Sequence, residues 1–340
     1  MIAAFLKNEV ASWLCSLIPL DLWHRLVDVD ILVPLWHVVS DQELAHISGL
    51  YTYRNERQFT ADIDFLLKRY APVCLNDVLL YLDGYGSLPP RPILFTFDDG
   101  FREVYDIIAP FLFRKGIPGV FFPITAAIDN HELCYPQKMS LVKKALPRLD
   151  TSPVSREISR RLTDAGINGR SLAVQLRGIG YRKRHLLDEV GSILGYNFQS
   201  YVAAVQPYLT SEQIRELLKK GFAFGAHSVD HPRYSELSLE EQLAQTRASV
   251  EFISSRYGYE CNTLALPYSD RGISPVFFDR VFSADFLKAT FGIDGITSCL
   301  NPRHLPRISI ERTDLSAGRI LARQFGRTLL RRDPRSKIGH

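Results

Sequence analysis

The chain has 340 residues, of which 46% are hydrophobic and 23% charged, and these proportions exclude a disordered or fibrous protein. A chain of this length buries enough apolar surface to fold without disulfides or a structural metal. The net charge of +4 is too small to indicate a nucleic-acid partner, and the five scattered cysteines, with no CxxC pair, indicate neither a disulfide framework nor a cysteine zinc site.

Residues 1–30 have the pattern of a helical segment. Lys7 and Glu9 interrupt the apolar stretch early and no small-residue cleavage site follows, so the segment is not typical of a signal peptide. No uninterrupted apolar run in the chain reaches the ~18 residues of a membrane span. We expect the apolar face of this helix to pack on the body of the protein. Its apolar residues recur at helical spacing: Leu6, Val10, Trp13, Leu14 and Leu17.

From residue 31 the chain alternates short apolar runs with helical periodicity, which is typical of an α/β protein. In the first half a helix is expected around Phe59, Ile63 and Leu66, with Asp62 and Asp64 on its solvent side. A second helix is expected from about Glu103 to Lys115, ending at Gly116. Strands are expected at residues 31–36, 93–97 and 119–122.

The alternation stops between about residues 131 and 207, where the pattern is mostly helical. Because it resumes afterwards, we interpret this stretch as a helical insertion within one domain of residues 31–315. Two capping boxes then mark helix starts, Thr210 with Gln213 and Ser238 with Glu241. Further strands are expected at residues 222–226, 263–266 and 305–310. Strands that are each followed by a helix allow either a barrel or an open doubly wound sheet.

The C-terminal segment, residues 316–340, is basic. From Gly318 to the end, seven basic residues stand against one acidic residue, and four arginines fall at every fourth position with apolar residues between them. A basic amphipathic helix of this kind can make peripheral contact with an anionic membrane surface. The alternative is a helix with a solvated basic face.

Two adjacent carboxylates end one predicted strand, in Phe95-Thr96-Phe97-Asp98-Asp99-Gly100. Reactive groups gather at the carboxyl ends of parallel strands, and paired like charges are best tolerated beside a cation or a shared proton. The alternative is a turn followed by a helix N-cap, for which Asp is also favoured.

Two histidines four residues apart follow another predicted strand, in His227-Ser228-Val229-Asp230-His231-Pro232. On one helical turn, both imidazoles can reach a single ion. Taken with the Asp pair, this spacing predicts a metal site with one carboxylate and two histidines, which leaves a coordination position open for water as in catalytic sites.

These two motifs resemble the first and second motifs of the polysaccharide deacetylases, the family 4 carbohydrate esterases. The resemblance runs from about Ile31 to Ile310 and implies a distorted (β/α)7-type barrel with a helical insertion. Three further segments carry it: the strand at 34–41, the strand at 221–226 and the closing segment at 305–308.

The resemblance also implies roles for particular residues. Asp99, His227 and His231 would bind a divalent metal, usually Zn²⁺, with Co²⁺, Mn²⁺ or Ni²⁺ as alternatives. Asp98 would be the general base that takes a proton from water. The substrate would be an N-acetylated amino-sugar glycan, and the backbone N–H of Tyr268 would help to hold the oxyanion.

The sequence departs from the family pattern at two places. Many members have an arginine that orients the base at the position of Ala265, and here Arg271 or Arg307 is the candidate substitute. No clean copy of the final motif supplies a histidine as general acid. His304 is the nearest candidate for this acid. His37, at the end of a predicted strand, is expected to line the pocket.

Three functions remain open at this point. The first is a metal-dependent N-deacetylase acting on an amino-sugar polymer, oligomer or lipid-linked glycan. The second is a catalytically weakened relative that binds a glycan or a partner, and the third is a metal amidohydrolase acting on a non-sugar amide. The absence of a convincing export signal favours a cytoplasmic protein. A cytoplasmic protein could also contact the membrane peripherally through the basic C-terminal helix.

Overall fold

The computed structural model describes residues 13–331, except residues 16, 28, 146–151, 284–285 and 297–300. Most of the predicted N-terminal helix and the last part of the basic segment lie outside these residues. Within them, no helix combines the length and the hydropathy needed to cross a membrane. Four cysteines are described and all are free thiols: Cys15, Cys74, Cys134 and Cys261.

Parallel strands form a closed ring. One sheet has the order β10-β1-β4-β5-β6 and another the order β7-β8-β9, and a parallel bridge from Ala226 to Leu264 connects them. Pro306 and Arg307 alone separate β9 from β10, which closes the ring. The strands are β1 (Pro34–Trp36), β4 (Phe95–Asp99), β5 (Gly119–Pro123), β6 (Ala223–Phe224), β7 (Thr263–Ala265), β8 (Ala289–Phe291), β9 (His304–Leu305) and β10 (Ile308–Ser309).

With β9 and β10 counted as one bent strand, the ring has seven strands, and the predicted distorted (β/α)7-type barrel is confirmed. The sequence predicted most strands, with three differences. The run at 93–97 contains two strands, since β3 (Pro92–Ile93) pairs with β2 (Ala71–Pro72) while β4 pairs with β1 and β5. The run at 305–310 is divided at Pro306, and β2 and β8 were not predicted.

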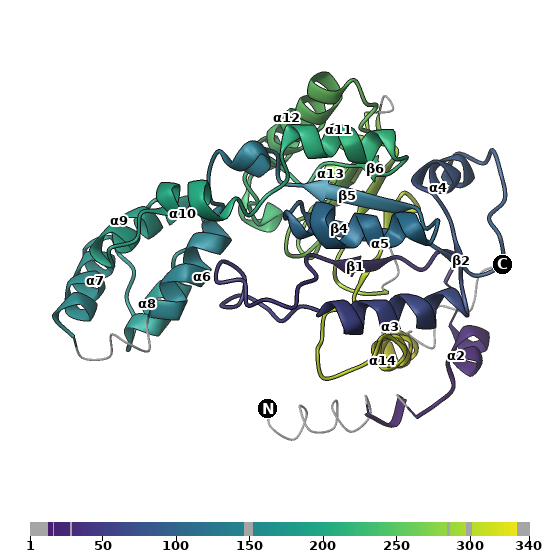
Figure 1. The fold of residues 1–340 in the computed structure, drawn as a ribbon, viewed down its shortest axis with the longest axis horizontal. Coiled ribbons are helices and arrows are strands. Elements are labelled where there is room, and N and C mark those ends of the chain that lie inside the picture. Colours follow the sequence, from purple (N-terminus) through teal and green to yellow (C-terminus); the bar gives the residue numbers. More distant parts are fainter. Residues whose placement is uncertain are drawn as a thin grey trace.

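Helices surround the barrel, with α3 and α14 on one side and α11 and α12 on the opposite side (Figure 1). Both predicted capping boxes are present, at the starts of α11 and α12. The helices outside the insertion are α2 (Leu20–Leu26), α3 (Glu56–Leu67), α4 (Leu75–Leu82), a π-helical turn (Val104–Ile108) leading into α5 (Ala109–Arg114), α11 (Ser211–Lys219), α12 (Leu239–Tyr257), α13 (Pro275–Phe282) and α14 (Ala317–Arg331).

The predicted helical insertion is present and extends to one side of the barrel (Figure 1). It has an apolar cluster of its own, in which Leu162 and Leu187 are fully buried. Phe101, next to the Asp pair, belongs to the same cluster and stacks on Tyr208. The insertion is therefore packed against the catalytic end of the barrel. Its helices are α6 (Tyr135–Ala145), α7 (Pro153–Asp164), α8 (Leu172–Arg177), α9 (Leu186–Ile193) and α10 (Phe198–Val205).

The C-terminal helix α14 is part of the barrel core. Leu321 and Phe325 are fully buried in the main apolar cluster, while Arg319 and Arg327 lie on the exposed face. The prediction that Asp62 faces solvent is wrong: its carboxylate is buried, pairs with Arg54 and accepts the backbone N–H of Ala317 at the start of α14. The apolar face of α14 is thus occupied by the protein itself.

Candidate active site

The Asp pair lies at the carboxyl end of β4, as predicted, and both side chains are buried. The chain turns immediately after the strand, because Asp99 has φ +68° and Gly100 has φ +71°. A Cβ atom at Gly100 would stand 2.6 Å from Cβ of Pro123, so only glycine fits this turn. The strand therefore ends with both carboxylates at the mouth of the barrel.

The two histidines lie on an irregular loop after β6, not on the predicted helical turn. Ser228 and His231 have positive φ angles of 65° and 62°, and Ser228 Oγ accepts the backbone N–H of His231. Four of the eight non-glycine residues with positive φ in the described chain lie at this site: Asp99, Ser228, His231 and Tyr268. Strained backbone of this kind concentrates at functional sites.

Asp99, His227 and His231 converge as the sequence predicted. The Nε2 atoms of the histidines are 3.2 Å apart and lie 3.4 Å and 3.3 Å from Asp99 Oδ1. Ligands about 2.0–2.2 Å from a tetrahedral zinc ion stand about 3.3–3.6 Å from one another, so this triangle has the size of one tetrahedral face. Asp99 Oδ1 is buried and has no hydrogen-bond partner among the described residues, which fits a place beside a cation.

The surroundings prepare these three side chains for a metal. His227 Nδ1 donates to the carbonyl oxygen of Ala265, which leaves Nε2 with its lone pair toward Asp99. Burial lowers the pKa of His231 to about 3, so its ring is neutral. Burial alone would raise the pKa of Asp99, but the surrounding histidines, the protonated His37 among them, outweigh burial and lower it. Tyr51, which the sequence did not single out, donates to Asp99 Oδ2.

Asp98 is held by Arg307, one of the two arginines proposed to replace the missing one. Both side chains are fully buried, and the guanidinium donates two parallel hydrogen bonds of 2.6 and 2.7 Å to the carboxylate. Burial raises the pKa of Asp98, but Arg307 outweighs burial and brings the pKa below its ordinary value. Arg271, the other candidate, instead lies exposed beside Asp294.

His37 lines the same cavity from the end of β1. Its Nδ1 is 2.7 Å from Oε2 of Glu311, and its backbone N–H donates to Oε1 of the same carboxylate. Burial lowers the pKa of His37, but the Glu311 charge and then the Asp pair outweigh burial and raise it to about 9. Glu311 lies two residues beyond β10, and this position at a strand end is the signal that the sequence offered for it.

Tyr268 and His304 occupy different environments. Tyr268, with φ +61°, lines the cavity, and its ring centroid is 4.6 Å from that of His231. His304 is buried between Thr290 and Asp270, with both ring nitrogens within hydrogen-bond distance of them. It is not among the residues that line the cavity, so the structure brings His37, and not His304, to the site.

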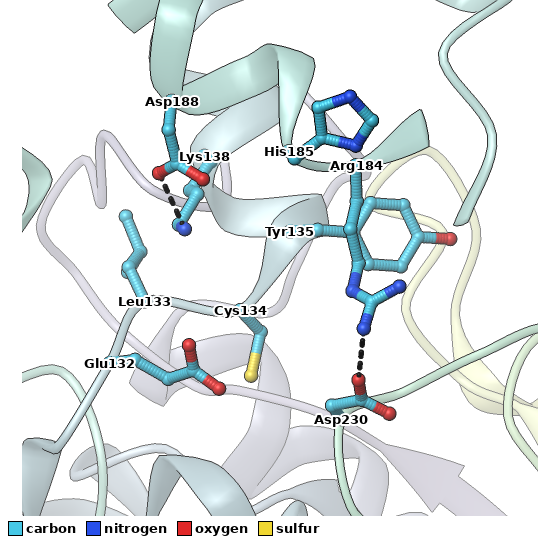
Figure 2. A pocket seen from close by; sticks show the side chains of 9 residues that line it. All are labelled: Glu132, Leu133, Cys134, Tyr135, Lys138, Arg184, His185, Asp188 and Asp230. Atoms are coloured by element: carbon cyan, nitrogen blue, oxygen red, sulfur yellow. Dashed lines mark hydrogen bonds and ion pairs between the residues drawn. The ribbon is translucent and has the colours of Figure 1, made fainter. Parts of the chain in front are cut away.

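The cavity above these residues has a volume of about 480 Å³. The barrel supplies its floor, and the insertion supplies one wall through α6 and the end of α8. A smaller cavity of about 360 Å³ lies beside it, within the insertion, and Tyr135 lines both. Figure 2 shows two ion pairs in this second cavity, Lys138 with Asp188 and Arg184 with Asp230.

The comparisons with solved structures concern the fold. The deacetylase PplD of Streptococcus pyogenes has a TM-score of 0.54 and 15% identity, with 88% of this chain and 99% of that chain covered. IcaB from Ammonifex degensii has the same score and identity, covering 86% and 97%. A de-N-acetylase from Aggregatibacter actinomycetemcomitans has a TM-score of 0.53 and 15% identity, covering 86% and 99%.

The sequence comparison concerns the family. No curated protein matches the chain. A family model described as polysaccharide deacetylase matches residues 85–172 and 183–276, more than half of the chain, and these ranges contain both the Asp pair and the His pair. The chain therefore belongs to the polysaccharide deacetylase family, as the order of its two motifs on the barrel indicated.

Proposed function

We propose that this protein is a metal-dependent hydrolase that removes N-acetyl groups from amino-sugar glycans. The observation that carries the proposal is the triangle of Asp99, His227 and His231 with the separate carboxylate of Asp98 beside it. Asp98 Oδ2 lies 3.9 Å from His227 Nε2, so a base that is not part of the triangle stands next to it. A cation held by three protein ligands leaves room for water, which is the arrangement of catalytic sites.

When bound, a divalent ion supplies Lewis-acid chemistry, since it acidifies water and stabilises negative charge on an amide oxygen. The donor set of one carboxylate and two imidazoles, with its tetrahedral spacing, favours zinc. Asp98, kept ionised and oriented by Arg307, accepts the proton of the attacking water. The backbone N–H of Tyr268 makes no hydrogen bond to other described residues and is the proposed donor to the oxyanion.

His37 is the proposed general acid. Cleavage of the C–N bond releases acetate and leaves an amine that needs a proton. Because Glu311 holds the proton on His37 at neutral pH, the imidazole can donate it from the wall of the cavity. His37 replaces His304 in this role, since both nitrogens of His304 are already engaged.

The second hypothesis, a catalytically weakened relative, rested on the missing arginine and the missing acid. Arg307 contacts the proposed base and His37 lines the cavity, and both observations favour the first hypothesis over the second. The third hypothesis, a non-sugar amidohydrolase, differs from the first in its substrate. It predicts activity on simple N-acetylated amines and not on N-acetylated sugars.

The experiment is acetate release from N-acetylglucosamine oligomers by protein stripped of metal and then reloaded with zinc. We expect activity only after reloading, and a loss of about 10²–10⁴-fold in Asp98→Asn, the range of general base catalysis. Equal, negligible release by wild type and Asp98→Asn on every glycan would contradict the proposal. Release from N-acetylated amines alone would favour the third hypothesis.

A further inference from the structure

Two cations in the catalytic cavity have no counter-charge. Lys143, on α6, and Arg177, the last residue of α8, both line the cavity. Neither makes an ion pair or a hydrogen bond with another residue of the described chain. The cavity's own carboxylates are engaged, Asp98 by Arg307 and Asp99 by the histidines.

The charge of Arg177 also disfavours the protonated form of Lys143. Partial burial lowers the pKa of Lys143, and the charge of Arg177 lowers it further. A half-buried ammonium beside a second cation is costly unless an anion offsets the charge. The third basic residue of the cavity, Arg233, has a partner in Glu236 and lies over the Tyr268 ring.

The helix dipole accounts for only part of this arrangement. Basic residues are favoured in the last turn of a helix, and both Lys143 and Arg177 occupy such positions. Lys144, in the same turn of α6, shows the ordinary outcome, since it is exposed and pairs with Glu43. The dipole does not explain why two helices end with unpaired cations in one cavity.

The neighbouring cavity provides an internal contrast. There, Lys138 pairs with Asp188 and Arg184 pairs with Asp230 (Figure 2). That cavity needs no external anion. Lys143 and Arg177, which have no partner among the described residues, lie in the cavity that contains the reaction centre.

We propose that Lys143 and Arg177 bind a phosphate group carried by the N-acetylated substrate. Two unpaired positive charges match a phosphate monoester or diphosphate, whereas a carboxylate would neutralise only one of them. A cavity of about 480 Å³ is within the usual range for a single small ligand, about 300–1,000 Å³, so it suits one sugar with its phosphate. This inference rests on the proposed deacetylase function and narrows its substrate class.

The first test measures binding without turnover. In the Asp98→Asn background, loaded with zinc, calorimetry compares N-acetylglucosamine 1-phosphate with N-acetylglucosamine. We expect the phosphorylated sugar to bind about 10- to 100-fold more tightly, as for hydrogen bonds to charged groups. The added substitutions Lys143→Gln and Arg177→Gln should remove most of this difference. If the preference persists in that variant, phosphate is held elsewhere, for example by the metal, and the inference fails.

The second test measures turnover and identifies the source of the phosphate. Acetate release is compared among neutral oligomers, the sugar 1-phosphate, a nucleotide diphosphate sugar and a prenyl-diphosphate-linked sugar in detergent. Preference for any phosphorylated substrate, lost with the double substitution and retained in Lys144→Gln, supports the inference. Equal rates on neutral and phosphorylated sugars, or preference for a uronic acid, overturn it.

The two proposals fail in different ways. If no substrate releases acetate but the binding preference depends on Lys143 and Arg177, the deacetylase proposal fails while the phosphate site stands. If neutral oligomers are deacetylated and a phosphate group gives no advantage, the phosphate site fails while the deacetylase proposal stands. Melting temperatures of the variants, compared with that of Lys144→Gln, show whether the substitutions leave the fold intact.

Discussion

Arg307 contributes to the site through a single contact, its paired hydrogen bonds with Asp98. Its Nε also donates to the carbonyl oxygen of Gly292, so the guanidinium is anchored on the side away from the carboxylate. It comes from the bend between β9 and β10, far along the chain from Ala265, where the family pattern has its arginine. The same charge thus reaches the base from a different strand.

Replacing Arg307 by Gln should therefore damage both the fold and the catalysis. The substitution leaves Asp98 buried without its cation, and breaking a buried pair costs about 3–5 kcal/mol. Because burial then raises the pKa of Asp98 against only the weaker effects of His227 and His37, the acidic limb of the pH–rate profile should move to higher pH. Urea unfolding and the pH dependence of kcat/KM measure the two effects.

Arg271→Gln is the matched control, since Arg271 is exposed and pairs only with Asp294 at the surface. It should change the free energy of unfolding by less than about 0.5 kcal/mol. An unmoved acidic limb in Arg307→Gln would show that Arg307 does not set the charge state of the base.

Glu311→Gln tests the general acid. Glu311 keeps His37 protonated up to about pH 9, while burial acts in the opposite direction. Without the Glu311 charge, the pKa of His37 falls, the imidazole loses its proton at lower pH, and the alkaline limb of kcat should move to lower pH. His37→Ala should lower kcat by about 10²–10⁴-fold. If His304→Gln shifts the alkaline limb and Glu311→Gln does not, the acid is His304.

At the scale of single residues, the sequence reveals only what lies in short motifs. Asp98, Asp99, His227 and His231 could be predicted because each pair is nearly contiguous and follows a strand. Tyr51 could not, and Glu311 had only its place after a predicted strand as a signal, since their contacts join residues 48 and 274 positions apart. Arg307 could be named as a candidate but not chosen over Arg271, because burial decides between them.

At the scale of elements, β6 and β7 approach closely just before His227. A Cβ atom at Gly225 would overlap the ring of Phe122 and would lie 2.5 Å from Thr263 Oγ1. Gly225→Ala should therefore push β6 from its neighbours, cost about 1–3 kcal/mol of stability and displace His227, with a lower affinity for zinc. Thermal unfolding and a zinc titration measure both.

The control for this substitution is Gly86→Ala. A Cβ there has no neighbour within 4 Å and the backbone is not in the left-handed region, so stability should be unchanged or slightly higher. Equal melting temperatures for the two variants would contradict a tight approach of β6 and β7.

Local signals explain which elements could be predicted. The capping boxes at Thr210 and Ser238 gave correct helix starts, because a cap depends on residues three positions apart. The prediction of a helical turn at His227 was wrong, because the positive φ angles of Ser228 and His231 depend on tertiary contacts. Strand β8 was missed because its three residues do not belong to a longer apolar run: Lys288 precedes them and Gly292 follows.

At the scale of the whole molecule, the site exists only when the ring of strands is closed. His37 follows β1, the Asp pair ends β4, Tyr268 follows β7, and Arg307 and Glu311 flank β10. The pairing of β10 with β1 brings the last and the first strand of the barrel together. The barrel itself was implied by family resemblance, since strand–helix alternation also allows an open sheet.

Helix α14 packs next to this closure, and its role bears on the predicted membrane contact. Its apolar residues Leu321 and Phe325 are fully buried, and its first N–H group is capped by Asp62. An amphipathic helix that uses its apolar face in the core has only its basic face left for a membrane. Membrane contact, where it occurs, would therefore be electrostatic and sensitive to salt.

Deleting residues 317–340 should consequently unfold the protein and not merely release it. Loss of the burial of Leu321 and Phe325 alone removes about 3–6 kcal/mol, and Asp62 loses the backbone N–H of Ala317. Arg319→Gln with Arg327→Gln, both exposed, should keep the wild-type melting temperature and reduce sedimentation with anionic vesicles at low salt. A deletion variant that melts like wild type would show that α14 is an accessory, because a core helix cannot be removed without a large loss of stability.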